Sequence, residues 1–222
     1  DSSNGQILTP FKTIQHGVDA AWVGDTVIVY PGTYAGNVDF EGKSIVLASR
    51  ILESGNELYT DSTIIEGIVT INDGVDSTAL FSGFTITGDF TNRGLYVTSD
   101  DNVLINHVKI LDVGGVQFQS AVATLHDAVI KHNEHSQVGG GVYIGSSTVD
   151  LANVVIDSNV TSANEGGGVY IYSSSVVTMD SVQVTNNVSD NSGGGIYSYG
   201  SCSLTISNSS INGNSTSSQG GG

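Results

Sequence analysis

The sequence predicts an all-β fold in which short parallel strands wind into a solenoid. Three observations support this prediction: a glycine-rich motif repeats at a constant interval, apolar residues align into columns, and asparagines recur at one position. The motif is GGGVY at 139–143 and 166–170 and GGGIY at 193–197, so successive copies are 27 residues apart, and a fourth GGG stands at 220–222. Constant periods of about 20–50 residues are typical of solenoids and other repeat folds.

The apolar columns predict the strands of each coil. One column contains Phe81, Ile105, Leu125, Leu151, Met179 and Ile206. Five residues later in each copy stand Ile86, Ile110, Ile130, Ile156, Val184 and Ile211. The residue before each member of this second column is expected to point outward, and these residues are Thr85, Lys109, Val129, Val155, Gln183 and Ser210. Alternation of inward and outward side chains is the pattern of a half-buried strand.

A second strand is expected in each coil, and it contains the aromatic position of the repeat. Its inward pairs are Leu95/Val97, Val116/Phe118, Val142/Ile144, Val169/Ile171 and Ile196/Ser198. The tyrosines of the repeat point outward between these pairs, so they stack from coil to coil. Tyr143, Tyr170 and Tyr197 form one row, and Tyr172 and Tyr199 point the same way two residues later. Such rows serve either as a platform for sugar rings or as a self-stacking ladder that stabilises the solenoid.

The recurring asparagines predict a ladder inside one turn of the solenoid. They lie eight residues after the first apolar column, at Asn133, Asn159, Asn187 and Asn214. Asparagine tolerates left-handed backbone geometry, and its amide can bond the amides above and below it. The ladder is therefore expected to be structural.

The N-terminal region follows a different pattern. Residues 13–22 predict a helix with Thr13 as its N-cap and with Ile14, Val18, Ala21 and Trp22 on one face. This helix would cover the first coil and block edge-to-edge pairing there. We therefore divide the chain into a cap over 1–24 and a solenoid over 25–222 whose C-terminal coil is unfinished. The longest irregular insert is expected at about residues 50–62.

Composition excludes several classes of function. Acidic residues number 22 and basic residues 6, which gives a formal net charge of −16, and no run of Lys or Arg predicts nucleic-acid binding. The longest apolar runs have four to five residues, whereas a membrane-spanning helix needs about 20. The single cysteine, Cys202, cannot form an internal disulfide, and no zinc-binding pattern is present.

A cluster of titratable residues is the candidate catalytic group. His107 and Asp127 occupy the same column in adjacent coils, so we expect them roughly 4.8 Å apart along the stack. A histidine beside a carboxylate is suited to acid/base chemistry. The segment 107–135 also contains Lys109, His126, Lys131, His132 and His135. Lys109 lies two residues after His107 on the same strand and could neutralise a uronate. The alternative is a polar face where these coils are more basic than their neighbours.

Two aspartate pairs are candidates for calcium, because hard carboxylate oxygens are its preferred ligands. They are Asp73 with Asp76 and Asp100 with Asp101. Turn formation explains both pairs more simply, since aspartate favours such turns. We expect no other cofactor.

The segment TIQHGVDAAWVGDTVIVYPGTYAGNVDFEGKSIVLAS (13–49) resembles the N-terminal entry of bacterial right-handed parallel β-helix proteins of the pectate-lyase-like superfamily. SGFTITG (82–88) and the GGG(V/I)Y repeats resemble its surface-protein branch, and they are similar to the repeats of chlamydial polymorphic membrane proteins. The resemblance implies a right-handed parallel β-helix of about nine coils with a short N-terminal capping helix. For the lyases of the superfamily, it implies a groove with a Lys or Arg base and often a calcium ion.

Regular repeats and few catalytic residue types favour a secreted or cell-surface structural or adhesive module, part of a longer stalk or fibre. The alternative is a polysaccharide lyase or other carbohydrate-active enzyme acting on acidic glycans at the coils of 107–135. Glycans, or neighbouring subunits stacked end to end, are the expected partners. An unfinished last coil predicts either further coils or such stacking.

Overall fold

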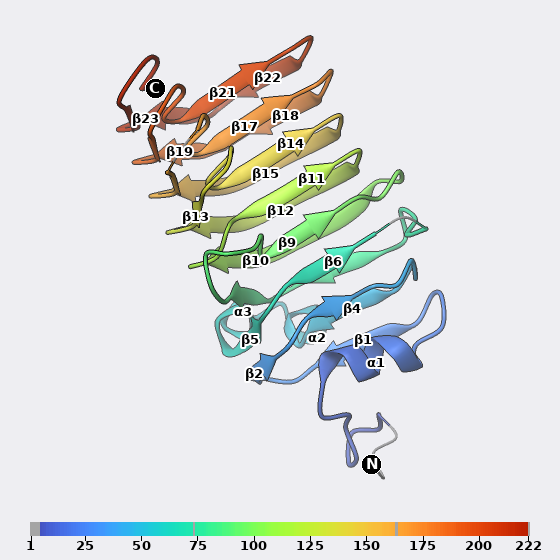
Figure 1. Cartoon of the computed structure of the whole chain (residues 1–222). Coiled ribbons are helices and arrows are strands. Elements are labelled where there is room, and N and C mark those ends of the chain that lie inside the picture. Colours follow the sequence, from blue (N-terminus) through green and yellow to red (C-terminus); the bar gives the residue numbers. More distant parts are fainter. Residues whose placement is uncertain (1–4, 73, 163, 222) are drawn as a thin grey trace.

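The computed structural model describes residues 5–72, 74–162 and 164–221. The strands stack along one axis into an elongated solenoid, with the N-terminus at one end and the C-terminus at the other (Figure 1). Every pairing between its strands is parallel. The predicted all-β parallel solenoid is confirmed.

The strands form three sheets that run along the solenoid. The 13-stranded sheet follows the path β1 (Thr26–Val29), β4 (Val46–Ser49), β7 (Leu80–Ser82), β10 (Val103–Leu111), β12 (Val122–Lys131), β15 (Thr148–Asp157), β18 (Val176–Asp180) and β22 (Ser203–Ser207). Its other members are β2 (Gly32–Ala35), β5 (Thr63–Glu66), β8 (Thr85–Thr87), β19 (Gln183–Thr185) and β23 (Ser210–Asn212).

The second sheet has seven strands: β3 (Val38–Asp39), β6 (Val69–Ile71), β9 (Leu95–Val97), β11 (Val116–Gln119), β14 (Val142–Gly145), β17 (Val169–Tyr172) and β21 (Ile196–Tyr199). The third has four: β13 (Glu134–His135), β16 (Val160–Thr161), β20 (Val188–Ser189) and β24 (Ser215–Thr216). Three helices complete the described chain, and they are α1 (Ile14–Ala20), α2 (Ile51–Ser54) and α3 (Leu58–Ser62).

The predicted apolar columns are the register of the strands. Leu125 pairs with Leu151 and Leu151 pairs with Met179, and all three side chains are buried. Ile130 and Ile156 pair in the same way in the second column. The solenoid interior is therefore one continuous apolar core, built by stacking equivalent side chains from successive coils.

The N-terminal helix is shorter than predicted. Thr13 is its N-cap, and its side chain accepts a hydrogen bond from the His16 backbone N–H. Ile14 and Val18 are buried against the first coil, but Trp22 is 81% exposed and lies beyond the helix. The prediction for Trp22 was wrong because Ala21 is extended, with ψ of 144°, which turns the chain off the helical face.

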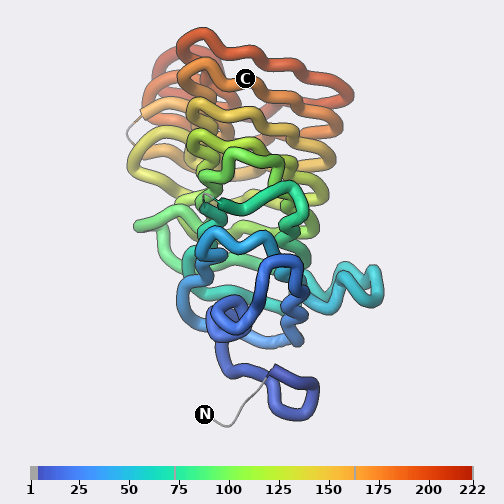
Figure 2. Tube along the Cα trace, turned by 90° about the vertical axis from the view of Figure 1, so that its right-hand side faces the viewer, coloured from blue at the N-terminus to red at the C-terminus, as the bar shows by residue number. Residues whose placement is uncertain are grey.

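The insert at 50–62 is ordered rather than irregular. It forms α2 and α3, and it projects from the stack of coils (Figure 2). The Thr60 hydroxyl donates to the His107 carbonyl at 3.1 Å, and the Thr85 hydroxyl donates to the Thr60 carbonyl at 2.8 Å. Thr85 was expected to face outward, and it is buried because α3 covers this part of the sheet.

Candidate functional site

A cavity of about 520 Å³ lies where α3 meets the outer face of β10, β12 and β15. The residues that line it are Asn56, Glu57, Leu58, Thr60, Asp61, His107, Val108, Lys109, Asp127, Ala128, Val129, Asn153 and Val155. Three of the four predicted catalytic candidates are therefore in one hollow, and the insert forms its wall.

Asp127 is the centre of the polar cluster in this cavity. Its Oδ2 lies 3.9 Å from His107 Nε2, the predicted partner, and 2.7 Å from His126 Nδ1, which the sequence analysis placed in the cluster without a partner. Asn153 Nδ2 donates to Oδ1 at 2.5 Å. Burial by itself would raise the pKa of Asp127, but the hydrogen bonds from Asn153 and His126 outweigh it and lower that pKa.

The position of His126 follows from a break in strand alternation. Asp127 has a left-handed backbone with φ of 52°, and His107 below it has φ of 49°. A left-handed residue inside a strand lets two consecutive side chains point outward, so His126 and Asp127 lie on the same face. The sequence signal was the spacing of five between the two apolar columns, because strict alternation places inward residues an even number of positions apart.

Both lysine candidates are engaged by carboxylates. Lys109 Nζ forms an ion pair with Asp61 of α3. Lys131 Nζ lies 2.8 Å from Asp157 Oδ2, and Lys131 does not line the cavity. Although burial acts to raise the pKa of Asp157, hydrogen bonds from Lys131, Asn186, Thr185 and Ser158 lower it strongly. Of the four catalytic candidates, His107, Lys109 and Asp127 therefore line the cavity, whereas Lys131 forms a separate ion pair with Asp157.

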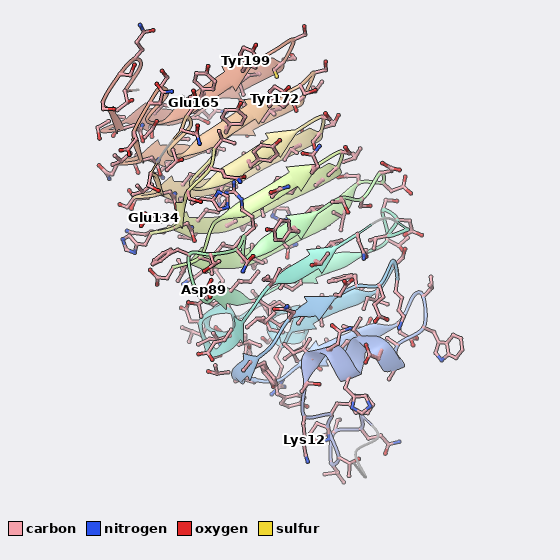
Figure 3. All side chains as sticks on the ribbon, in the orientation of Figure 1. Lys12, Asp89, Glu134, Glu165, Tyr172 and Tyr199 are labelled. Atoms are coloured by element: carbon pink, nitrogen blue, oxygen red, sulfur yellow. The ribbon has the colours of Figure 1, made fainter. Side chains whose placement is uncertain are left out.

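The tyrosines stack face to face. Ring centroids are 5.8 Å apart for Tyr143 and Tyr170, 5.5 Å for Tyr170 and Tyr197, and 5.9 Å for Tyr172 and Tyr199, with interplanar angles of 8°, 15° and 1°. Figure 3 shows Tyr172 and Tyr199 one above the other on the same side of the solenoid. Nearly parallel rings at these distances are offset-stacked, as in a self-stacking ladder. Tyr172 and Tyr199 are 40% and 59% exposed, and the sugar platform stays a prediction.

The four asparagines form a buried hydrogen-bonded ladder. Asn133, Asn159 and Asn187 each donate through Nδ2 to the Oδ1 of the next member, at 2.9 Å in all three cases. The backbone N–H groups of the same residues donate to the same oxygens. Asn214 ends the ladder among the described residues and donates to the Val184 carbonyl.

Sequence reasoning missed Arg93, which is only 2% exposed. Its guanidinium donates to the carbonyls of Gly114, Gly139 and Val138, and its Nε is buried without a partner in the described part of the chain. Burial lowers the pKa of Arg93 to about 10. Arg93 lies just below the coils that carry the long glycine-rich turns, and it satisfies carbonyls there.

The aspartate pairs give no metal geometry within the described residues. Asp73 lies outside them. Asp76 accepts hydrogen bonds from the backbone N–H and the hydroxyl of Thr78, at 2.8 and 2.5 Å, and these bonds lower its pKa. Asp100 and Asp101 are exposed. No group of three or more His, Cys, Asp or Glu side chains in the described ranges is placed to hold a metal ion.

Comparison with known proteins identifies the class. A family model described as the right-handed beta helix region matches residues 50–222. The match covers more than half of the chain, so the protein belongs to the right-handed β-helix family. No curated protein and no solved structure matches the chain significantly. No described helix has the length and apolarity to cross a membrane.

Proposed function

We propose that this protein is a structural or adhesive module of the cell surface or the extracellular space, part of a longer stalk or fibre, in the surface-protein branch of the pectate-lyase-like superfamily. The observation that carries the proposal is the unbroken register of the C-terminal coils. The apolar residues, the asparagines and the tyrosines of each coil all lie next to their equivalents in the following coil. Such stacking makes a stiff rod stabilised by nearest-neighbour contacts.

The pairing of the lysines supports a structural role over lyase chemistry. A lyase acting on acidic glycans needs free cationic groups for the uronate and for proton abstraction. Lys109 and Lys131 are each bound to a carboxylate, and the formal net charge of −16 repels a polyanion. Calcium binding at the aspartate pairs stays a prediction, and the proposed structural role does not depend on it.

A second candidate function rests on the cavity under α3. The insert departs from the repeat over His107 and Asp127, which line the cavity. Asp127 also lies 2.7 Å from His126 Nδ1, and a histidine oriented by a carboxylate is an acid/base arrangement. A carbohydrate-active enzyme that uses this dyad is therefore the alternative.

End-to-end association of subunits is also proposed, at the C-terminal coil. Residues 191–222 contain no charged side chain. Strand edges are usually protected by charges or proline. Light scattering over a range of concentrations tests this association, and a constant monomer mass would refute it.

One pair of assays tests the proposed function. Beads coated with the chain are passed over glycan-coated and cell-coated surfaces under flow, and the soluble chain is incubated with pectate, alginate and glycosaminoglycans. Retention of beads without new double bonds or reducing ends in the polysaccharides is the expected result. Turnover that disappears in the variants His126→Ala and Asp127→Asn would replace the structural proposal by the enzymatic one.

A further inference from the structure

The floor of the cavity under α3 is aliphatic. Val129 and Val155 point outward from β12 and β15, pair with each other in register, and are only partly buried. Leu58 of α3 stands on the wall and is 69% exposed. Polar residues occupy the same column in the coils beyond, at Gln183 and Ser210. The two valines are thus an apolar strip in a column whose other members are polar.

The rim of the cavity is acidic. Glu57, Asp61 and Asp127 line it, and Lys109 and His107 lie opposite them. Lys109 already forms an ion pair with Asp61. Among the described residues, Asp127 accepts from the amide of Asn153 and from His126, and each carboxylate oxygen can accept two hydrogen bonds. Asp127 therefore retains acceptor capacity toward a further donor.

The lining selects against two ligand classes. Acidic glycans would meet three carboxylates and one lysine that is already paired. Sugars that stack on aromatic rings find none among the described residues that line the cavity. The combination that fits is a positive charge carried on an aliphatic chain, because such chains bury their methylene groups on apolar surface and keep the charge at the rim.

We propose that this cavity binds an alkylammonium group, with its methylene chain on Val129 and Val155 and its ammonium at Asp127. Lys109 supplies an internal precedent, since its own alkylammonium side chain reaches across the cavity to Asp61. The lysine side chain of a protein partner and a free aliphatic amine share this chemistry. The inference adds a ligand class to the adhesive role proposed above, and it is tested separately from that role.

The experiment titrates the ¹⁵N-labelled full chain with pentylamine, with Nα-acetyl-lysine-N-methylamide, and with two control probes, pentanol and a galacturonate trimer. Backbone amide shifts at Val129 and Val155 report binding at the site. Both amines are expected to shift these amides in a saturable way, and the two control probes are not. Tighter binding of the lysine derivative indicates a protein partner, and tighter binding of pentylamine indicates a free amine.

Variants separate a specific site from attraction to an acidic protein. Asp127→Asn and the control Asp190→Asn, an exposed residue far along the chain, leave the molecule with the same net charge. Asp127→Asn is expected to weaken binding about fivefold, as loss of one exposed ion pair would, while Asp190→Asn leaves it within about twofold. Equal weakening by both variants, saturable binding of the uronate trimer at these amides, or no saturable amine shift would overturn the proposal.

A second variant, Asp61→Asn, tests the proposal even if Asp127→Asn fails to fold. Asp61 is an exposed residue of α3, so its replacement leaves the solenoid intact. The substitution frees the Lys109 ammonium to compete at Asp127, and amine binding is expected to fall about fivefold. Unchanged binding in Asp61→Asn would contradict the proposal. Failure of bead adhesion together with saturable amine binding would remove the adhesive role and leave this site standing.

Discussion

The C-terminal coils and the coils around the insert are built on different principles. From Asn133 to Asn214, each coil repeats the one before it, and each asparagine of the ladder bonds the equivalent asparagine of the next coil. Around α3, polar side chains pair with residues of a different kind, such as Lys109 with Asp61 and His126 with Asp127. Repetition produces a ladder, while its interruption produces a cavity with an uneven distribution of charge.

The largest expected effect is the loss of one ladder member. Asn187→Ala leaves the Asn159 amide and backbone N–H without their acceptor and the Ile156 carbonyl without its donor. We expect a loss of about 4 kcal/mol in the free energy of unfolding, because buried polar groups are left unpaired. Chemical denaturation measures it. The exposed Asn191→Ala is the control, and equal losses in the two variants would show that the ladder is not a special source of stability.

Arg93→Met tests the junction between the two regions. The substitution removes the donor for the carbonyls of Gly114, Val138 and Gly139, so we expect a loss of about 3 kcal/mol. Arg93→Lys should recover part of it, since one ammonium still donates to carbonyls. If thermal unfolding of Arg93→Met matches that of the parent chain, Arg93 does not support the long turns.

Stacking of tyrosines should contribute less. Tyr170 lies between the rings of Tyr143 and Tyr197, and Tyr96 occupies the same column beside a glutamine. We expect Tyr170→Ala to cost about 1 kcal/mol more than Tyr96→Ala, which is the usual increment for aromatic pairs. A double-mutant cycle with Tyr197→Ala should show coupling, and additive effects would mean that the rings contribute only through burial.

The smallest effect is a dependence of stability on pH from His135. Burial, with Arg93 as a second cause, lowers the pKa of His135 to about 4. The unfolded chain then binds a proton more readily, so stability is full above about pH 6.5 and falls as the pH drops toward 4. After allowance for solvent screening at this half-buried residue, we expect about 1 kcal/mol. His135→Gln should flatten this part of the stability profile, and an unchanged slope would assign it to other groups.

The repeat made the fold predictable, whereas the site depended on contacts that no repeat encodes. Leu125, Leu151 and Met179 could be aligned because each coil faces its neighbour with equivalent residues. The contact of Asp61 with Lys109 joins residues 48 positions apart across an insert with no counterpart in other coils, so no column pointed to it. Arg93 was missed because it has no equivalent in the other coils, although its acceptors include Gly139 of the repeat. His126 was given no partner because strict strand alternation would place it on the opposite face from Asp127.

Vertical registry of the interior is the claim on which the structural role depends, and methyl NOE spectroscopy of the selectively labelled chain tests it directly. The account predicts cross-peaks between Leu125 and Leu151 and between Leu151 and Met179, and none between Leu125 and Met179, which are two coils apart at about 10 Å. Absence of the first two cross-peaks in the folded protein would contradict the solenoid and the role inferred from it.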